Sequence, residues 1–585
     1  MSAADTPRKG PDARRDSQDG GSRDRRNQAG RQRHRGRGSA AAARSGDGQR
    51  TGRRYSSSAP SARRRQADPA RRAAYRVLRA VSSEDAYGNL VLPREIRAAR
   101  LNRQDAAFAT ELTYGTLRAS GTYDLILAHC VDRGLDQLDA DVLDALRLGA
   151  HQLLAMRVGS HAAVDETVAL VRDRIGAGPS GLVNAVLRKV SEQGWDDWLQ
   201  LLLREGKDDE PTRQGIVHYH PAWIVRALGQ ALRWHHEGTL ESLLGADNAA
   251  PEVHLAELPL GPDHEAGGLV AAIEAGAVSS PLLHGAATFR GGDISRLSGV
   301  SEGTLRVQDI GSQWIARALA AAQIPDAAQI PDAGQIPEGP GTSGAPQAPA
   351  QRRWLDLCAG PGGKAALLAA LASSQGAHLV ANEPLQHRAE LVARALEPVE
   401  RSAWTVTSHD GRQMAPEDHG LFERILVDAP CTGLGALRRR PEARWRRTPA
   451  DLAELTLLQQ ELLDAAVGLM SPGGLLAYVT CSPHVAETVA QVEDLLTRHP
   501  ELKVLDARQA MRDVATAEGA GLIPGASAAQ EASPEEAAAV KHDASVTNVQ
   551  APPAGSSRLL PSQVVQLWPH VHGTDAMFFA LLQKR

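Results

Sequence analysis

The chain has 585 residues, of which 42% are hydrophobic and 23% charged, and its formal net charge is −4. This length predicts several domains with ordinary cores, and no apolar run approaches the roughly 20 residues of a membrane helix. Four cysteines without CxxC spacing predict neither a disulfide framework nor a metal site. The N-terminal residues lack the apolar segment of a secretory signal. We therefore expect a protein of the reducing cytoplasm that binds no membrane and no metal.

Charge is distributed unevenly along the chain. Residues 1–66 carry 18 basic and 6 acidic residues, whereas the remainder carries 47 basic and 63 acidic residues. The first 66 residues also contain almost no large apolar side chains. They cannot bury enough surface to offset chain entropy, and we predict a disordered basic tail. Residues 31–37, Arg-Gln-Arg-His-Arg-Gly-Arg, are typical of RNA-binding segments and equally of solubilising tails.

Helical periodicity begins at about residue 67 and extends to residue 195. Apolar residues recur at steps of three and four, as in Ala73, Val77 and Val81, and strand signals are absent. We predict an all-helical domain over 67–195. Four arginines of this domain could meet phosphates, although a solvated helix face is the better explanation for any single one: Arg118, Arg147, Arg157 and Arg188.

Four segments complete the predicted domain organisation. Residues 196–215 are polar and charged and are predicted to be a linker. Over 216–319 a helical pattern gives way to short alternating runs, which predicts a small α+β module. Residues 320–350 contain three copies of Gln-Ile-Pro-Asp/Glu and are predicted to be a low-complexity loop. The last domain is expected over 351–585, with a disordered Ala-, Glu-, Ser- and Pro-rich insert at 514–557.

The last domain contains four short apolar runs that each end in polar residues, at Asp356, Glu383, Asp428 and Thr480. This pattern is typical of parallel strands whose carboxyl ends line a site, and it predicts a mainly parallel, doubly wound α/β sheet.

The first run leads through a glycine-rich turn into a helix. Glycines let the backbone approach a ligand closely, and the N–H groups at a helix start attract carboxylates. A phosphate loop is disfavoured because no Ser or Thr follows the lysine, and an ordinary βα turn is the alternative. The turn is Cys358-Ala359-Gly360-Pro361-Gly362-Gly363-Lys364.

Two acidic residues extend this predicted ligand site. Glu383 ends the second run 27 positions after Asp356, where an acidic side chain can bind a ribose diol. Asp410 falls where a third strand would end, and an aspartate there can contact an adenine amino group. An adenosine that carries an amino-acid tail is S-adenosyl-L-methionine, and this is the cofactor that we expect.

Two of the cysteines, Cys431 and Cys481, follow apolar strands and precede Gly- or Pro-containing turns. A buried structural cysteine is the usual interpretation of a lone cysteine, and we keep it for Cys130 and mostly for Cys358. A thiolate that adds to carbon 6 of cytosine pushes electron density onto carbon 5, which can then accept a methyl group. The two cysteines therefore suggest a cytosine methyltransferase.

An arginine-rich segment lies between the two cysteines. Residues 438–447 contain six arginines together with Trp445, which predicts a surface for RNA backbone and base stacking. A charged, exposed loop is the alternative.

Motifs in both halves of the chain resemble one family. Residues 109–118 and 181–188 resemble the NusB-type RNA-binding domain, which precedes the catalytic part in the RsmB/Sun family of ribosomal RNA methyltransferases. The most specific motifs of that family are matched by Asp-Leu-Cys-Ala-Gly-Pro-Gly-Gly-Lys (356–364), Asp-Ala-Pro-Cys (428–431), Thr-Cys-Ser (480–482) and Leu-Trp-Pro-His-Val-His-Gly-Thr-Asp (567–575). Ala576 departs from the family, which usually has Gly there.

The resemblance covers roughly residues 68–585 apart from the two inserts, and it implies a role for each matched residue. Cys481 would be the nucleophile, Cys431 would assist product release, and Asp428 would contact the base near the cofactor. Lys364 would lie at the site.

The expected function is S-adenosyl-L-methionine-dependent methylation of cytosine carbon 5 in RNA, most specifically 16S ribosomal RNA. One alternative is the same chemistry on tRNA, another RNA or DNA, and in DNA enzymes the Pro-Cys cysteine is the nucleophile. Another is an RNA-binding or antitermination factor that uses only the helical domain, which the intact Thr-Cys-Ser motif disfavours.

Overall fold

The computed structural model describes residues 67–205, 209–235, 237–261, 267–324, 352–525 and 559–585. The predicted basic tail and most of both predicted low-complexity segments lie outside these ranges. Across the described residues, no helix is both long and apolar enough to cross a membrane.

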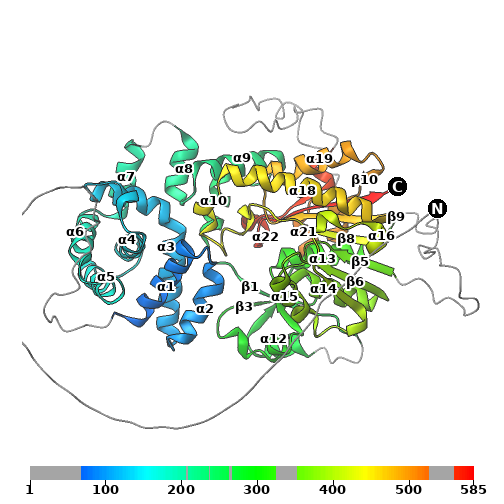
Figure 1. Ribbon diagram of the computed structural model, residues 1–585, viewed down its shortest axis with the longest axis horizontal. Helices are drawn as coiled ribbons and strands as arrows, with labels where there is room; N and C mark the ends of the chain where they lie inside the picture. Colours follow the sequence, from blue (N-terminus) through cyan, green and yellow to red (C-terminus); the bar gives the residue numbers. More distant parts are fainter. Residues whose placement is uncertain (1–66, 206–208, 236, 262–266, 325–351, 526–558) are drawn as a thin grey trace, which may run out of the picture. The chain divides into compact units, whose positions relative to one another are not determined.

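The N-terminal part is helical, as predicted, and encloses a core of its own. Asp68 caps the first helix by accepting the Arg71 N–H at 2.9 Å, and Pro69 occupies the first helical turn. The helices are α1 (Pro69–Ser83), α2 (Gly88–Ala98), α3 (Arg103–Cys130), α4 (Ala140–Leu154), α5 (Ser160–Arg174) and α6 (Ser180–Val190) (Figure 1).

The linker prediction for residues 196–215 is wrong. This stretch forms most of α7 (Trp195–Glu205) and α8 (Glu210–His218). The buried Trp198 anchors α7, and its indole N–H donates to the Val190 carbonyl at 3.0 Å. Charged residues occupy the exposed sides of these short helices, so their composition resembled that of a linker. Helices α9 (Ala222–His235) and α10 (Leu240–Asn248) follow.

The small α+β module is confirmed. Its antiparallel sheet has the strand order β2-β3-β1-β4, and β1 aligns Val253 with Phe289 of β3. Helix α13 connects this module to the larger sheet and buries Trp314 in that sheet's core. The elements are β1 (Val253–Glu257), α11 (Gly268–Glu274), β2 (Ala277–Ser279), β3 (Ala286–Phe289), α12 (Ser298–Glu302), β4 (Leu305–Val307) and α13 (Ile310–Ala321).

The predicted doubly wound α/β sheet is also confirmed. Its strand order is β10-β12-β9-β8-β5-β6-β7, with β11 paired to β12. The five strands from β9 to β7 pair in parallel, and the strands around β12 pair antiparallel. The strands are β5 (Arg352–Asp356), β6 (Ala377–Asn382), β7 (Trp404–Thr407), β8 (Phe422–Asp428), β9 (Met470–Thr480), β10 (Leu502–Val504), β11 (Val565–Gln566) and β12 (Phe578–Lys584).

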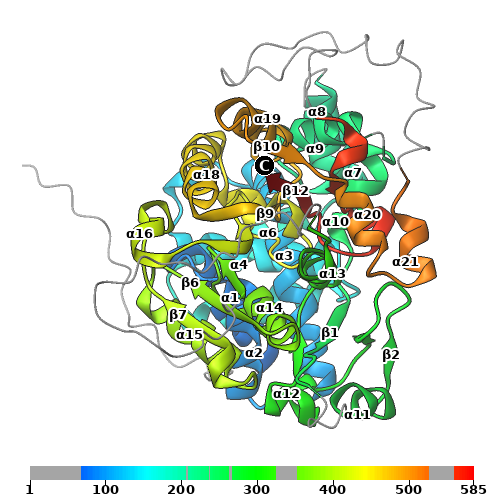
Figure 2. The same ribbon diagram turned by 90° about the vertical axis from the view of Figure 1, so that its right-hand side faces the viewer.

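Helices cover both faces of this sheet (Figures 1 and 2), and each face has its own buried cluster. The first face packs against α13, α14 (Gly363–Ser374), α15 (Gln386–Leu396) and α20 (Ala507–Arg512). The second packs against α9, α10, α18 (Pro449–Leu469) and α19 (Val489–Arg498). The short helices are α16 (Pro416–His419), α17 (Ala443–Arg446), α21 (Ala517–Leu522) and α22 (Pro569–His572).

The predicted insert at 514–557 begins too early. Residues 514–525 are described and include α21, and Ala515 forms a bridge with Leu283. Their small residues favour close packing here: the N–H of Thr516 donates to the Leu282 carbonyl at 3.0 Å.

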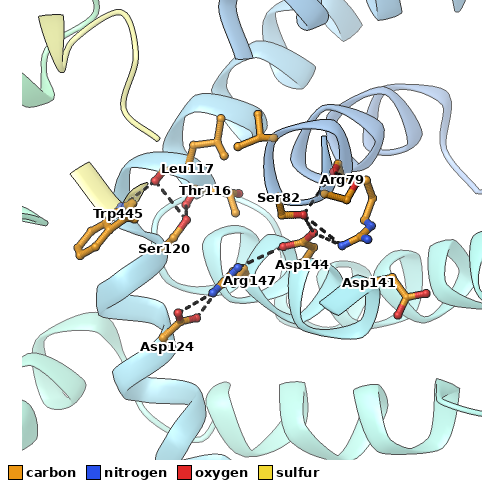
Figure 3. A network of polar contacts seen from close by, with 12 residues as sticks. Arg79, Ser82, Thr116, Leu117, Ser120, Asp124, Asp141, Asp144, Arg147 and Trp445 are labelled. Carbon is orange, nitrogen blue, oxygen red and sulfur yellow. Dashed lines mark hydrogen bonds and ion pairs between the residues drawn. The ribbon is translucent and has the colours of Figure 1, made fainter. Parts of the chain in front are cut away.

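The arginine-rich segment 438–447 is largely an internal contact rather than the predicted stacking surface. The Trp445 indole N–H donates to the Leu117 carbonyl of α3 at 3.0 Å (Figure 3). A Cβ at Gly121 would lie 2.1 Å from the Trp445 ring, so the ring lies directly on the α3 backbone. Arg444 is fully buried and donates to the Asn248 side chain at 2.7 Å. Because its ring packs on α3, Trp445 is not free to stack on a base.

The four arginines of the helical domain differ in how accessible they are. Arg147 donates two hydrogen bonds to Asp124, at 2.7 and 2.6 Å, and one to the buried Asp144 at 3.2 Å (Figure 3). Its carboxylate partners therefore compete with any phosphate. Arg118 is partly buried, whereas Arg157 and Arg188 are exposed and remain candidates for RNA contact.

Candidate active site

The candidate site lies at the carboxyl ends of four neighbouring strands, β6, β5, β8 and β9. The chain leaves β5 toward β6 on one side and is flanked by β8 on the other, which is the switch point where doubly wound sheets bind ligands. Each of the four predicted polar strand ends lies at this edge: Asp356 on β5, Glu383 after β6, Asp428 on β8 and Thr480 on β9.

The glycine-rich turn after β5 contacts the acidic residue after β6. The Ala359 N–H donates to the Asn382 carbonyl at 2.8 Å, which joins the two strand ends. A Cβ at Gly360 would lie 2.0 Å from the Glu383 carboxylate, so this position accepts only glycine without a shift. Pro361 and Gly362 complete the turn, Gly363 begins α14, and the partly exposed Cys358 precedes it.

Glu383 is 2% exposed and has two polar partners. Its carboxylate accepts the Leu385 N–H at 3.2 Å and pairs with Arg388 at 3.3 Å. The Arg388 guanidinium also donates to the Gly360 carbonyl at 3.0 Å, so the same side chain contacts both the glycine-rich turn and Glu383.

Asp410 lies at the same edge but is occupied locally. Its carboxylate accepts hydrogen bonds from the Arg412 guanidinium at 2.9 and 2.6 Å. This hydrogen bonding lowers the pKa of Asp410 below its ordinary value. The Asp410 side chain is 32% exposed, so solvent competes with the ion pair between Asp410 and Arg412. Asp410 therefore lies at the same edge of the sheet as the other predicted site residues but is not joined to them.

Lys364 and Asp428 form the inner ion pair of the site. The Lys364 Nζ lies 2.7 Å from the Asp428 carboxylate, and the lysine side chain is only 12% exposed. Burial lowers the pKa of Lys364, but the Asp428 charge and hydrogen bond outweigh it and raise the pKa overall. The lysine is therefore cationic at neutral pH. Its charge also acts on Cys481.

Asp356 begins the motif 356–364, but the sequence does not predict a role for its own side chain in the site. It is 1% exposed, and no side chain among the described residues donates a hydrogen bond to its carboxylate, which has only the Cys358 backbone as a hydrogen-bonding neighbour. Burial and the neighbouring Asp428 raise the pKa of Asp356 to about 7. A buried carboxyl with so high a pKa costs stability when it ionises, which is typical of functional sites.

This cost predicts the stability of an Asp356→Asn variant. The unfolded carboxyl has its ordinary pKa of 3.8 and the folded one about 7, so the folded state binds the proton more tightly. The contribution of the Asp356 carboxyl to the free energy of unfolding is therefore largest below pH 4. It falls as the pH rises to about 7, by at most about 4 kcal/mol. Asp356→Asn should therefore raise the unfolding temperature at pH 8, with a smaller effect at pH 5.

Thermal unfolding between pH 5 and pH 8 measures this effect. Glu417→Gln is the control, because it neutralises an exposed carboxyl on the same domain. If Asp356→Asn and Glu417→Gln change the unfolding temperature equally at every pH, ionisation of Asp356 does not lower the stability of the folded state.

The two predicted catalytic cysteines lie side by side, with their sulfur atoms 3.3 Å apart. The hydrogen bond from Cys431 is the largest cause that lowers the pKa of Cys481, and the Arg440 and Lys364 charges lower it further. Burial and Asp428 oppose this but do not outweigh it. The same hydrogen bond and burial raise the pKa of Cys431 well above its ordinary value. Cys481 is therefore the thiol that ionises first, and Cys431 remains its hydrogen-bond donor.

Glu487 holds the loops of both cysteines, and the sequence interpretation missed it. It is fully buried, and its carboxylate accepts the Thr432 N–H at 2.7 Å and the Gln459 amide at 3.2 Å. The Thr432 hydroxyl also donates to Glu487 and lies 3.1 Å from the Ser482 hydroxyl. Thr432 and Ser482 directly follow the two cysteines. The available signal was an acidic residue within the otherwise uncharged stretch 485–489.

The C-terminal motif supports the same loops. The Gly435 N–H donates to the Cys481 carbonyl, and the Ala576 N–H donates to the Gly435 carbonyl, both at 2.9 Å. Arg439 pairs with the buried Asp575. Ala576 makes this contact through its backbone, so its departure from glycine does not remove the hydrogen bond.

Among the described residues, no group of three or more His, Cys, Asp and Glu side chains has the geometry of a metal site.

Family models match two parts of the chain. The model for 16S rRNA methyltransferase RsmB/F matches residues 345–583, and the NusB family model matches residues 68–192.

Individual proteins match most of the chain. A Mycobacterium tuberculosis protein named "Putative methyltransferase Rv1407" is 43% identical over 526 residues, which cover 89% of this chain and 98% of that protein. Ribosomal RNA small subunit methyltransferase B of Pseudomonas putida is 31% identical over 441 residues, covering 74% of this chain and 91% of that protein. The crystal structure of PH0851 superposes with a TM-score of 0.65 at 19% identity, covering 88% and 98% of the two chains, which shows a shared fold.

Proposed function

The chain belongs to the RsmB/F family of 16S rRNA methyltransferases, and from this premise we propose that it methylates carbon 5 of a cytosine in 16S rRNA. S-adenosyl-L-methionine is the proposed methyl donor, and Cys481 is the proposed nucleophile. The family membership confirms the resemblance drawn from the sequence motifs. The observation that carries the proposed chemistry is the pair of thiols 3.3 Å apart, of which Cys481 is the more acidic.

The residues at the strand ends fit this cofactor. The turn over 358–364 offers backbone close to Glu383, with no Cβ at Gly360 to fill the space. Glu383 is the proposed ligand of the ribose. Asp410 is the proposed contact of the adenine amino group, once Arg412 releases the Asp410 carboxylate. The buried carboxyl of Asp356 supplies an additional acceptor beside Lys364 and Asp428. When bound, S-adenosyl-L-methionine supplies a methyl group activated by a sulfonium charge.

Cys481 opens the proposed reaction on the RNA base. Its thiolate forms a bond to carbon 6 of cytosine, and the displaced electron pair makes carbon 5 nucleophilic toward the methyl group. Asp428 holds the base, and Lys364 keeps that carboxylate paired. The proton on carbon 5 then leaves, its electron pair restores the ring double bond, and the bond to the Cys481 sulfur breaks.

The cysteine pair explains how Cys431 can assist this last step. Before reaction, Cys431 is kept protonated chiefly by its hydrogen bond to Cys481 and also by the charge there. Once Cys481 is a neutral thioether, this hydrogen bond and this charge are gone, and the pKa of Cys431 falls, although burial still raises it. Cys431 can then release its own proton to solvent, and its thiolate, with the sulfur 3.3 Å from the Cys481 sulfur, accepts the proton that carbon 5 must lose.

Glu383→Ala is expected to weaken S-adenosyl-L-methionine binding by about 1–3 kcal/mol, because ribose hydrogen bonds to a buried carboxylate are lost. Isothermal titration calorimetry on the full chain measures this change. Glu390→Ala is the matched control, since Glu390 is an exposed carboxylate on the neighbouring helix α15. Equal affinities of the Glu383 variant and the wild type would remove Glu383 from the cofactor site.

The function itself is tested on an unmodified 16S rRNA transcript with labelled S-adenosyl-L-methionine, followed by bisulfite mapping of the product. We expect one or a few protected cytosines. Label in RNA without a protected cytosine would place the methyl group elsewhere and overturn the cytosine-5 assignment.

A further inference from the structure

The segment 438–447 keeps one arginine exposed. Arg438 and Arg444 are buried, and Arg439, Arg446 and Arg447 are partly buried. Arg446, for example, donates to the Val81 and Ala86 carbonyls of the helical domain. Of the six arginines in this segment, Arg440 alone is exposed. The internal contacts described above therefore do not account for Arg440.

Arg440 is held by an aromatic ring from the other domain. Its guanidinium lies over the Tyr87 ring at 4.8 Å from the centroid, and Tyr87 stands between α1 and α2 of the helical domain. Arg446 lies 5.8 Å from the same centroid. The Arg440 side chain makes no hydrogen bond and no ion pair with any residue that the structure describes. Stacking uses the face of a guanidinium, so its five N–H donors point outward from the edge.

The same arginine belongs to the loop that contacts the Cys481 backbone. The backbone N–H of Arg440 donates to the Ala436 carbonyl at 2.9 Å. Ala436 follows Gly435, whose backbone N–H donates to the Cys481 carbonyl. The Arg440 charge is among the causes that lower the pKa of Cys481. A planar cation with unused donors thus stands on the loop that supports the proposed nucleophile, over a ring that the helical domain supplies.

Resting on the proposed function, we propose that Arg440, oriented by Tyr87, binds a backbone phosphate of the RNA next to the target cytosine. A guanidinium fork matches the two oxygens of a phosphate, and stacking on Tyr87 fixes its direction before the RNA arrives. The substrate site is then shared between the catalytic and helical domains. Tyr87 is a positioning residue in this arrangement, and Arg440 is the residue that contacts substrate.

The proposal predicts a change in the salt dependence of RNA binding. Each phosphate contact releases about 0.7–0.9 counterions, so Arg440→Ala should flatten the plot of log affinity against log salt by about that amount. Near 0.1 M salt the affinity should fall about tenfold. Arg440→Lys should keep the slope, because its charge remains, but lose part of the affinity. The probe is an unmodified 16S rRNA transcript without cofactor, titrated with the full chain at several potassium chloride concentrations.

Two sets of controls separate binding from folding. Arg296→Ala removes an arginine whose side chain is 85% exposed in the small α+β module and should leave the slope unchanged. Tyr87→Phe keeps the ring face and should bind as the wild type, whereas Tyr87→Leu should lose affinity, and adding Arg440→Ala to it should cost little more. Thermal unfolding of each variant checks that the fold is intact.

An unchanged salt slope in a folded Arg440→Ala protein would overturn the proposal, as would an equal loss in Arg296→Ala. Either result would leave the proposed methyl transfer standing, because it is measured separately by bisulfite mapping. A wild type that binds the transcript but methylates no cytosine would instead overturn the proposed function and leave the phosphate contact intact.

Discussion

Cys481→Ala is expected to abolish methylation and to form no covalent adduct, whereas Cys431→Ala should methylate RNA once and remain attached to it. The reason is the division of roles between two sulfurs 3.3 Å apart. Without Cys481 nothing attacks carbon 6. Without Cys431 the carbon 5 proton has no acceptor beside the adduct, so the thioether to Cys481 persists. The measurement is a protein–RNA band that survives denaturing electrophoresis in the Cys431 variant alone.

The same experiment discriminates between the alternatives. A stable adduct with Cys481→Ala instead of Cys431→Ala would reverse the roles and bring the enzyme closer to the DNA type. Full activity of both variants would exclude a covalent mechanism. Cys130→Ala is the matched control, since this buried cysteine belongs to the helical core and should not change the adduct.

The pH profile of the wild type follows from the same pair. The hydrogen bond from Cys431 lowers the pKa of Cys481 below its ordinary value of 9.0. Single-turnover rates should therefore rise with pH and level off below pH 9, once Cys481 is fully ionised.

Glu487→Leu is expected to cost about 3 kcal/mol or more in stability and to abolish most of the activity. Its carboxylate accepts hydrogen bonds from Thr432 and Gln459 in a fully buried place, and leucine would leave these donors unpaired. The loop of Cys431 would then lose its connection to the loop of Cys481, whose Ser482 contacts Thr432. Chemical denaturation gives the stability, and single-turnover methylation gives the rate.

Glu487→Gln separates geometry from charge at this position. A glutamine oxygen can accept the Thr432 N–H, and the Thr432 hydroxyl can accept from the amide nitrogen, so most of the network is retained. This variant should keep most of the stability and activity. If glutamine is as damaging as leucine, the charge of Glu487 matters rather than its hydrogen-bond geometry. If leucine is harmless, Glu487 does not position the cysteines.

The architecture of the catalytic part could be predicted from the sequence alone, because its signals are local. The apolar runs that end in Asp356, Asp428 and Thr480 each form one whole strand. A parallel sheet places the carboxyl ends of these strands at one edge. The glycines of the turn over 358–364 predicted a backbone close to a ligand and left an ordinary βα turn as the alternative; in the structure a Cβ at Gly360 would lie 2.0 Å from the Glu383 carboxylate. Family motifs then identified the two cysteines.

Which polar residues are buried, paired or free could be seen only in the folded chain. Charged helices α7 and α8 resembled a linker, because composition does not show that Trp198 is buried. Six arginines and Trp445 resembled one RNA surface, yet Trp445 packs on α3 and Arg444 is fully buried. The partners of these residues lie hundreds of positions away in the sequence, as with Tyr87 and Arg440. Burial and long-range pairing set the role of a charge, and neither is encoded within a local window.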